Sequence, residues 1–242
     1  MSKRFAFILA LSLSVLPGMA LAADGRVLFV SGDASIERGG QKSPALKGQL
    51  IQTGDVLVTG AGARLQWRMA DDSFYALRQN SRFEIKEYTA TKGTNGGGTA
   101  LYNLLRGGVR VLSGLIGKGN PDAFKLNTPV ATLGIRGTDF TTIACSGDCT
   151  GPGGAAVADG AYVKVDEGGA DATNGDGTAG ANKGEYIMVN SPPQTATTMP
   201  AVFYSWKADF QFMFDPLSLG LEDLRIESDF NIRIEAPSTS PN

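Results

Sequence analysis

Pairs of carboxylates are the side chains in this sequence best suited to bond-making chemistry. Adjacent acids occur at Asp71-Asp72 and at Asp166-Glu167, and two carboxyl groups held about 5–9 Å apart across a cleft could hydrolyse a glycosidic bond. Neighbouring residues of a strand point to opposite faces, so such pairs more often mark turns and solvated edges. The sequence contains no histidine, which excludes Ser-His-Asp and Cys-His catalysis. We therefore expect no catalytic residues, and a protein that is not an enzyme.

Two short motifs resemble ligand-binding loops, but each lacks essential residues. Residues 114–119 resemble the end of a phosphate loop. The full motif would begin with a glycine at residue 112 and end with Ser or Thr at residue 119, but these positions hold Leu112 and a glycine. Residues 171–177 resemble a calcium loop, but the EF-hand spacing places Ala172 at position one and Lys183 at position twelve. Turn chemistry explains the Asn and Asp residues of that segment better, although a weak calcium site of another type stays open. We predict no cofactor and no metal site.

The two cysteines predict a local disulfide. Cys145 and Cys149 enclose three residues, and in an oxidising compartment such a pair typically closes a small loop. A loop this short stabilises the fold by at most about 2 kcal/mol on chain-entropy arguments. The spacing differs from the C-x-x-C of redox sites, and zinc would need further ligands. We expect a structural bridge.

Arg136 is the residue whose surroundings most favour a binding role. It lies between Gly134 and Gly137 in the stretch 127–145, where the glycines permit a bulge or a close backbone approach. The pattern predicts a strand, a corner at the glycines and a second strand, with Pro129 at a strand start or an edge. The guanidinium could clamp a carboxylate of a partner or ligand, or bind carbonyls left unpaired at the corner. We favour the structural role.

The elements that must position these residues are strands. Apolar and polar residues alternate with a period of two, as where Leu65, Trp67 and Met69 share one face. The 32 glycines among 242 residues suit short strands joined by tight turns, and residues 27–38 predict a first hairpin. The pattern therefore predicts an all-β fold. We expect one antiparallel or rolled β domain, built as a sandwich, a barrel or a short β-solenoid, with a C-terminal amphipathic hairpin.

Four segments resemble the FecR domain, a bacterial extracytoplasmic module. Residues 128–140 read Thr-Pro-x-Ala-Thr-x-Gly-Ile-Arg-Gly-Thr-x-Phe, which is similar to the C-terminal hallmark of that family. Residues 50–60, 64–73 and 104–117 resemble earlier parts of the family pattern in the same order, with Asp72 where that pattern usually has glycine. The matching residues, for which we expect mainly structural roles, are Gly54, Asp55, Gly107, Gly108, Thr128, Pro129, Gly134, Arg136, Gly137 and Thr138.

This resemblance implies a role outside the cytoplasm. FecR-like modules are best known for relaying iron-siderophore signals, in proteins that carry an anti-sigma segment and one membrane helix before the periplasmic part. After the N-terminal stretch, no segment of this sequence is apolar enough to span a bilayer as a helix. We therefore expect that this chain does not carry a signal across the inner membrane by itself.

Composition divides the chain into four parts. Residues 1–22 have a basic start, a short apolar core and an Ala-x-Ala ending, typical of a cleaved signal peptide. Residues 23–190 form the FecR-like β domain, and residues 191–202, with two adjacent prolines, predict an extended linker. Residues 203–242 predict an amphipathic hairpin or tail that packs on the domain or on a partner. A possible interaction surface on it comprises Trp206, Phe210, Phe212 and Phe230.

These features favour a binding protein of the bacterial envelope. The formal net charge of −2 with scattered Lys and Arg gives no electrostatic footprint for nucleic acid. We predict a periplasmic or extracellular, non-enzymatic module that binds an envelope protein, as a sensor or scaffold. A module that binds carbohydrate or the cell wall is the alternative, and a component of iron-siderophore signalling without its own membrane relay is the second.

Overall fold

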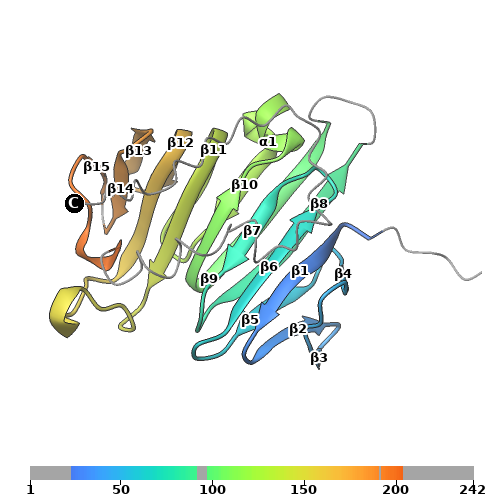
Figure 1. Ribbon diagram of the computed structural model, residues 1–242. Coiled ribbons are helices and arrows are strands. Elements are labelled where there is room, and N and C mark those ends of the chain that lie inside the picture. Colours follow the sequence, from blue (N-terminus) through green and yellow to red (C-terminus); the bar gives the residue numbers. More distant parts are fainter. Residues whose placement is uncertain (1–22, 92–96, 191, 204–242) are drawn as a thin grey trace, which may run out of the picture.

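The computed structural model describes residues 23–91, 97–190 and 192–203, and this part of the chain consists mostly of strands (Figure 1). The strands form one hydrogen-bonded sheet of 15 strands that does not close into a barrel. The all-β prediction is confirmed. The sheet is mixed rather than purely antiparallel, because β9 (Gly98–Leu112) and β10 (Phe124–Asn127) run parallel.

The sheet folds back on itself into two layers, which share β9, β11 (Thr132–Cys145) and β12 (Gly160–Asn174). The first layer also contains, in order of pairing, β3 (Gln41–Pro44), β2 (Ala34–Arg38), β5 (Val56–Thr59), β8 (Arg82–Ala90), β10 and β13 (Gly177–Asn182). The second layer also contains β4 (Leu50–Ile51), β1 (Gly25–Ser31), β6 (Arg64–Met69), β7 (Phe74–Leu77), β14 (Tyr186–Val189) and β15 (Pro193–Ala196).

The three shared strands cross between the layers at bends. β9 pairs with β8 and β10 before residue 107, and with β7 and β11 from residue 107 onward. β11 and β12 change partners where the register between them shifts, at residues 136–140 and 165–169. Helix α1 (Leu115–Gly119) and the 3-10 turn η1 (Pro121–Ala123) connect β9 to β10 and return the chain in a parallel direction. The architecture is therefore a sandwich whose layers are continuous with each other.

The main core lies between the two layers. Trp67 of β6 contacts Phe83 of β8 with ring centroids 5.2 Å apart, and Tyr75 of β7 contacts Tyr102 of β9 at the same distance. Each contact joins a second-layer strand to a first-layer strand, and all four side chains are fully buried. Leu65 and Met69 are buried beside Trp67. The predicted inward face of residues 65–69 is therefore confirmed.

The predicted first hairpin is wrong. β1 pairs with β4 and β6, whereas β2 pairs with β3 and β5. The turn after β1 leads from the second layer to the first. Gly32 lies in this turn, where its φ of +73° and the close approach of Ala63 favour glycine. Alternation identified both strands, but it carries no information on which strands become neighbours.

The segment 191–202, predicted as an extended linker, contains a paired strand and the start of a 3-10 turn in its described residues. Residues 193–196 form β15, which pairs with β14, and the 3-10 turn η3 (Ala201–Phe203) buries Val202 and Phe203. Phe203 packs on Tyr186, with ring centroids 5.6 Å apart. Tertiary contacts therefore order a segment whose Pro and Thr content predicted an extended chain.

A second, smaller core covers the outer side of the second layer. Ile143, Tyr162 and Tyr186 project from the sheet and pack against Val202 and Phe203. Cys145 and Cys149 form the predicted disulfide within this cluster, and the 3-10 turn η2 (Pro152–Gly154) follows it.

The predicted signal peptide, residues 1–22, lies outside the described residues, as does the predicted tail from residue 204 onward with Trp206, Phe210, Phe212 and Phe230. In the described part of the chain, no helix has both the length and the apolar character needed to cross a membrane.

Candidate functional site

The glycine pair 107–108 forms the bend of β9. Gly107 has a φ of +79°, which favours glycine. A Cβ on Gly107 would lie 2.2 Å from Ser81 Oγ and 2.7 Å from Ser81 Cα, so no side chain fits there. Gly108 N–H donates to Ser81 Oγ at 2.9 Å. Ser81, which the sequence did not single out, thus fixes the point where β9 leaves the first layer.

The bends of β11 and β12 lie directly against each other. Gly137 has a φ of +58° and Gly168 a φ of +74°. A Cβ on Gly168 would lie 2.4 Å from the carbonyl oxygen of Gly137. Thr138 closes the bend, because its hydroxyl donates to the Gly169 carbonyl at 2.8 Å and its N–H donates to Ser113 Oγ at 2.7 Å. The predicted glycine corner is therefore a bend within one strand.

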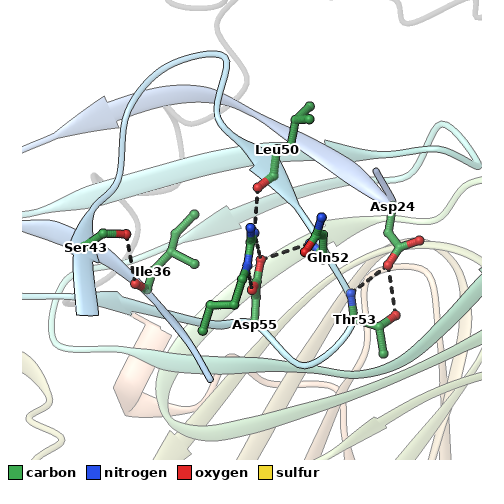
Figure 2. A network of polar contacts seen from close by, with 8 residues as sticks. Asp24, Ile36, Ser43, Leu50, Gln52, Thr53 and Asp55 are labelled. Atoms are coloured by element: carbon green, nitrogen blue, oxygen red, sulfur yellow. Dashed lines mark hydrogen bonds and ion pairs between the residues drawn. The ribbon is translucent and has the colours of Figure 1, made fainter. Parts of the chain in front are cut away.

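Asp55 of the Gly54-Asp55 segment forms an ion pair with Arg38, which sequence reasoning missed and whose side chain is 45% exposed (Figure 2). Asp55 is fully buried. Arg38 donates to Asp55 through Nε at 2.6 Å and Nη2 at 2.7 Å, and Gln52 N–H donates to the same carboxylate at 2.9 Å. The hydrogen bonds to Asp55 raise the pKa of Arg38 above its usual value. Gly54, with a φ of +89°, makes the turn, and the ion pair holds the loop that leads into β5.

Thr128 and Pro129 form the turn between β10 and β11. Thr128 Oγ1 accepts a hydrogen bond from Ala131 N–H at 3.1 Å and donates to the Ala131 carbonyl at 3.0 Å. Pro129 is exposed, and it lies in the turn ahead of β11 rather than in a strand. The Thr128 hydroxyl therefore closes the turn, and Pro129 lies within it.

Arg136 and Gly134 face outward from the first layer. Arg136 Nη1 pairs with Asp171 Oδ2 of β12 at 2.5 Å, and the two side chains are 52% and 38% exposed. A Cβ on Gly169 would lie 2.9 Å from Arg136 Nη2, and one on Gly180 would lie 2.7 Å from Asp171 Oδ1. The ion pair therefore lies flat over two glycines.

We call Gly134, Arg136, Gly169, Asp171 and Gly180 the glycine face. Gly134 is its unexplained member, because its φ lies outside the left-handed region and a Cβ on it would meet no atom within 4 Å. Neither the backbone conformation nor the packing of the fold therefore explains why residue 134 is a glycine.

A hydrogen-bonded row of side chains runs beside the glycine face on the same side of the first layer. Asn103 Nδ2 donates to Glu84 Oε2 at 2.6 Å, and Asn127 Nδ2 donates to Asn103 Oδ1 at 3.0 Å. Thr132 Oγ1 donates to Asn127 Oδ1 at 2.9 Å. The row spans β8 to β11 and holds these polar side chains in fixed positions.

The sequence comparison assigns the central part of the chain to a family. Residues 55–171, which include the three bends and Arg136, match the family model described as "FecR protein". This part of the chain is a FecR domain. Its sheet extends beyond the matched residues, because β1 and β4 pair with β6 and with each other at one end, and β14 and β15 extend the second layer at the other.

Two solved structures of a "putative anti-sigma factor" from Parabacteroides distasonis ATCC 8503, at 1.65 and 2.50 Å resolution, are similar to this chain at 14% sequence identity and a TM-score of 0.46. Each similarity covers 65% of this chain and, for the 1.65 Å structure, 65% of that chain. No curated protein matches the sequence.

The carboxylate pairs of the FecR domain lie at turns and in ion pairs. Asp72 is exposed and has a φ of +64°, so it occupies a left-handed turn position where the family pattern usually has glycine. Asp71 points the other way and is buried, and its carboxylate accepts from Ser73 Oγ at 2.6 Å and from Tyr88 OH at 3.1 Å. Burial raises the pKa of Tyr88.

The second pair, Asp166 and Glu167, makes ion pairs with Lys164 and Lys183, respectively. The structure therefore does not bring the four acids together across a cleft, since each has partners within its own turn or strand pair.

Proposed function

We propose that this protein is an exported, non-enzymatic module of the bacterial envelope whose FecR domain binds a partner protein through the glycine face. The single observation that carries the proposal is Gly134. Glycine within a strand weakens it, because glycine loses more backbone entropy on folding and has no side chain to pack. A strand glycine without a left-handed φ or a close neighbour is suited to the close approach of another backbone.

Arg136 supports a protein partner at the same place. Its guanidinium is about half exposed and contacts Asp171 through Nη1. A guanidinium carries five N–H donors in a planar fork, so N–H groups are left to bind a carboxylate or a carbonyl of a partner. A clamp of this kind beside Gly134 combines a charged contact with a place where a partner backbone can lie close on the sheet face.

The carbohydrate-binding alternative predicts exposed, coplanar aromatic rings. In the described part of the chain, every aromatic side chain is buried or half-buried. The polar row from Glu84 to Thr132 could bind sugar hydroxyls. Retention of cell-wall polysaccharide by the immobilised protein would therefore favour this alternative. A link to iron-siderophore signalling is implied by resemblance to the family, and it requires the same kind of protein contact.

Export is tested by the N-terminus of the mature chain. When the 242-residue chain is expressed in a bacterial host, we expect the protein in the periplasmic fraction with Ala23 as its first residue, because the sequence 20–22 ends a signal peptide. N-terminal mass spectrometry of each fraction measures this. A chain that keeps Met1 and stays in the cytoplasm would contradict the export part of the proposal.

Binding through the glycine face is tested with matched variants of the mature chain. Wild type, Gly134→Gln, Arg136→Ala and the control Lys86→Ala, an exposed residue of β8, are immobilised and incubated with envelope extract. We expect one or more proteins retained by wild type and by Lys86→Ala but lost from the two face variants. Equal retention by all four proteins would overturn the proposal, as would retention of cell-wall polysaccharide with no protein.

A further inference from the structure

The edge of β1 is open over most of its length. On the side away from β6, its first two residues pair with β4. Val27 then exchanges hydrogen bonds with the loop before β4, as its N–H donates to Gln49 at 2.9 Å and its carbonyl accepts from Gly48 at 2.8 Å. Among the described residues, no strand pairs with this side of β1 at residues 28–31.

The other sheet edges carry features that oppose pairing. β3 contains Lys42 and Pro44, and β15 begins with Pro193, which has no N–H to donate. On β13, the carbonyl of Gly180 already accepts from Thr195 Oγ1 at 2.6 Å. The edge of β1 has no proline or charge at residues 28–31, and its register with β6 shifts between Val27 and Phe29, so the regular part of the open edge is residues 29–31. It carries the apolar run Leu-Phe-Val followed by serine, which is typical of a strand that accepts a neighbour.

A groove of about 480 Å³ adjoins this edge. Its lining includes Arg26 and Leu28 of β1, Lys47 and Leu50 of the loop and strand that follow β3, and Arg68 of β6. Leu50 is 42% exposed. The groove thus brings an apolar side chain and charged side chains to one end of the open edge, which it reaches at Leu28.

The groove is positively charged. Arg26 and Lys47 are exposed, and in the described part of the chain neither forms an ion pair. Arg68 forms an ion pair with Asp72, in which Nε donates to Oδ1 at 3.1 Å. The groove thus carries three cationic side chains and the carboxylate of Asp72, which favours an acidic ligand. Arg26 and Lys47 can bind such a ligand without first breaking an ion pair.

We propose that the edge of β1 binds an extended, acidic segment of a partner protein as an added strand. The main chain of the segment would pair with residues 28–31, where β4 stops short. Its acidic side chains would contact Arg26 and Lys47, and an apolar one would contact Leu50. This surface belongs to the second layer and is separate from the glycine face on the first, so either site could exist without the other.

The test uses the mature full-length chain and a ten-residue probe peptide of alternating Val and Glu. We expect binding by calorimetry, with protection from hydrogen exchange, when peptide is added, at those amides of residues 28–31 that point away from β6. The same peptide with alternate backbone amides N-methylated keeps its charge but cannot pair as a strand, so we expect it not to bind. Equal binding of the N-methylated peptide would overturn the proposal, because charge alone would then explain the affinity.

Charge recognition is tested with a matched pair of double variants. Arg26→Glu/Lys47→Glu should weaken binding about tenfold or more. The control Lys86→Glu/Lys125→Glu changes the net charge equally on exposed residues of the first layer, and it should bind as wild type does. Equal loss in both double variants contradicts a local site. Protection, before peptide is added, of the amides of residues 28–31 that point away from β6 also contradicts the proposal, because the edge would already be occupied within the chain.

Discussion

Two regions of the FecR domain use the same residue types for different purposes. At the bends, Gly107, Gly137 and Gly168 have positive φ angles, and the neighbours of Gly107 and Gly168 leave no room for a side chain. On the glycine face, Gly134 has an ordinary strand φ and open space where a side chain would lie. The first region is determined by the chain's own folding, whereas at Gly134 in the second neither the backbone conformation nor the packing requires a glycine.

The comparison shows that one short motif can serve both stability and binding. Gly134 and Gly137 are separated by two residues, yet Gly134 has an ordinary strand conformation and Gly137 lies at the crossing between layers. Arg136 lies between them and pairs on the surface, while Thr138 is buried and bonds the neighbouring strand. Substitutions should therefore divide the motif into two classes.

The largest loss of stability is expected at the bends. Gly168→Ala combines a positive φ, which costs about 1–2 kcal/mol for a side chain, with a backbone oxygen 2.4 Å from the new Cβ. Overpacking of this kind costs a further 1–3 kcal/mol or so, and we expect a total of about 3 kcal/mol in the free energy of unfolding. Urea denaturation measures it, and a loss below about 1 kcal/mol would show that the bends can relax.

A loss of similar or slightly smaller size is expected for Arg38→Ala. The substitution leaves the fully buried carboxylate of Asp55 without its charged partner. Breaking a buried ion pair costs about 3 kcal/mol, and because the Arg38 side chain is 45% exposed we expect a loss of about 2 kcal/mol. The control is Arg82→Ala, whose partner Glu37 is partly exposed and should tolerate the change. Equal melting temperatures for the two variants would contradict the role assigned to Asp55.

Sequence reasoning recovered strands with clear alternation, such as residues 65–69 with their inward face, because a period of two is encoded locally. It also identified the disulfide, since Cys145 and Cys149 are close in the chain. It missed β15, whose Pro and Thr content predicted a linker. It could not recover the neighbours of each strand. The crossing of β9, β11 and β12 between layers and the parallel pairing of β9 with β10 depend on contacts between distant residues.

The same limit applies to the candidate site. Asp55 was identified through the family pattern, but its partner Arg38 lies 17 residues away, and nothing local indicates the pairing. Asp71 was interpreted as a turn residue, which is correct, yet its burial depends on Tyr88 and on helix α1, whose Leu115 N–H donates to the Asp71 carbonyl at 2.8 Å. Burial of a polar group follows from tertiary packing and not from its sequence neighbours.

Removal of the disulfide is expected to have a moderate effect on the free energy of unfolding. Cys145→Ser/Cys149→Ser should lower the free energy of unfolding by at most about 2 kcal/mol, since the bridge closes a very short loop. The local consequence should be larger, because both cysteines belong to the cluster that buries Val202 and Phe203. Hydrogen exchange at residues 186–189 and 201–203 should rise more than exchange in β9. A uniform rise would instead indicate one cooperative unit.

A small effect on stability is expected for Arg136→Ala. The ion pair with Asp171 is about half exposed, and pairs of this kind contribute about 1 kcal/mol or less. We expect near-normal thermal unfolding together with loss of the partner retained by wild type. A stability loss above about 2 kcal/mol would return Arg136 to the bracing role that its sequence position favoured.

The most direct test compares Gly134→Ala with Gly137→Ala, the same substitution in the same strand. Gly134→Ala should leave the free energy of unfolding unchanged or raise it by about 0.4–1 kcal/mol, because alanine restricts the unfolded chain and meets no neighbour. Gly137→Ala should lower it by about 1–2 kcal/mol, because its φ of +58° disfavours a side chain. Equal destabilisation by the two substitutions in urea would contradict the division of the motif into bend and binding face.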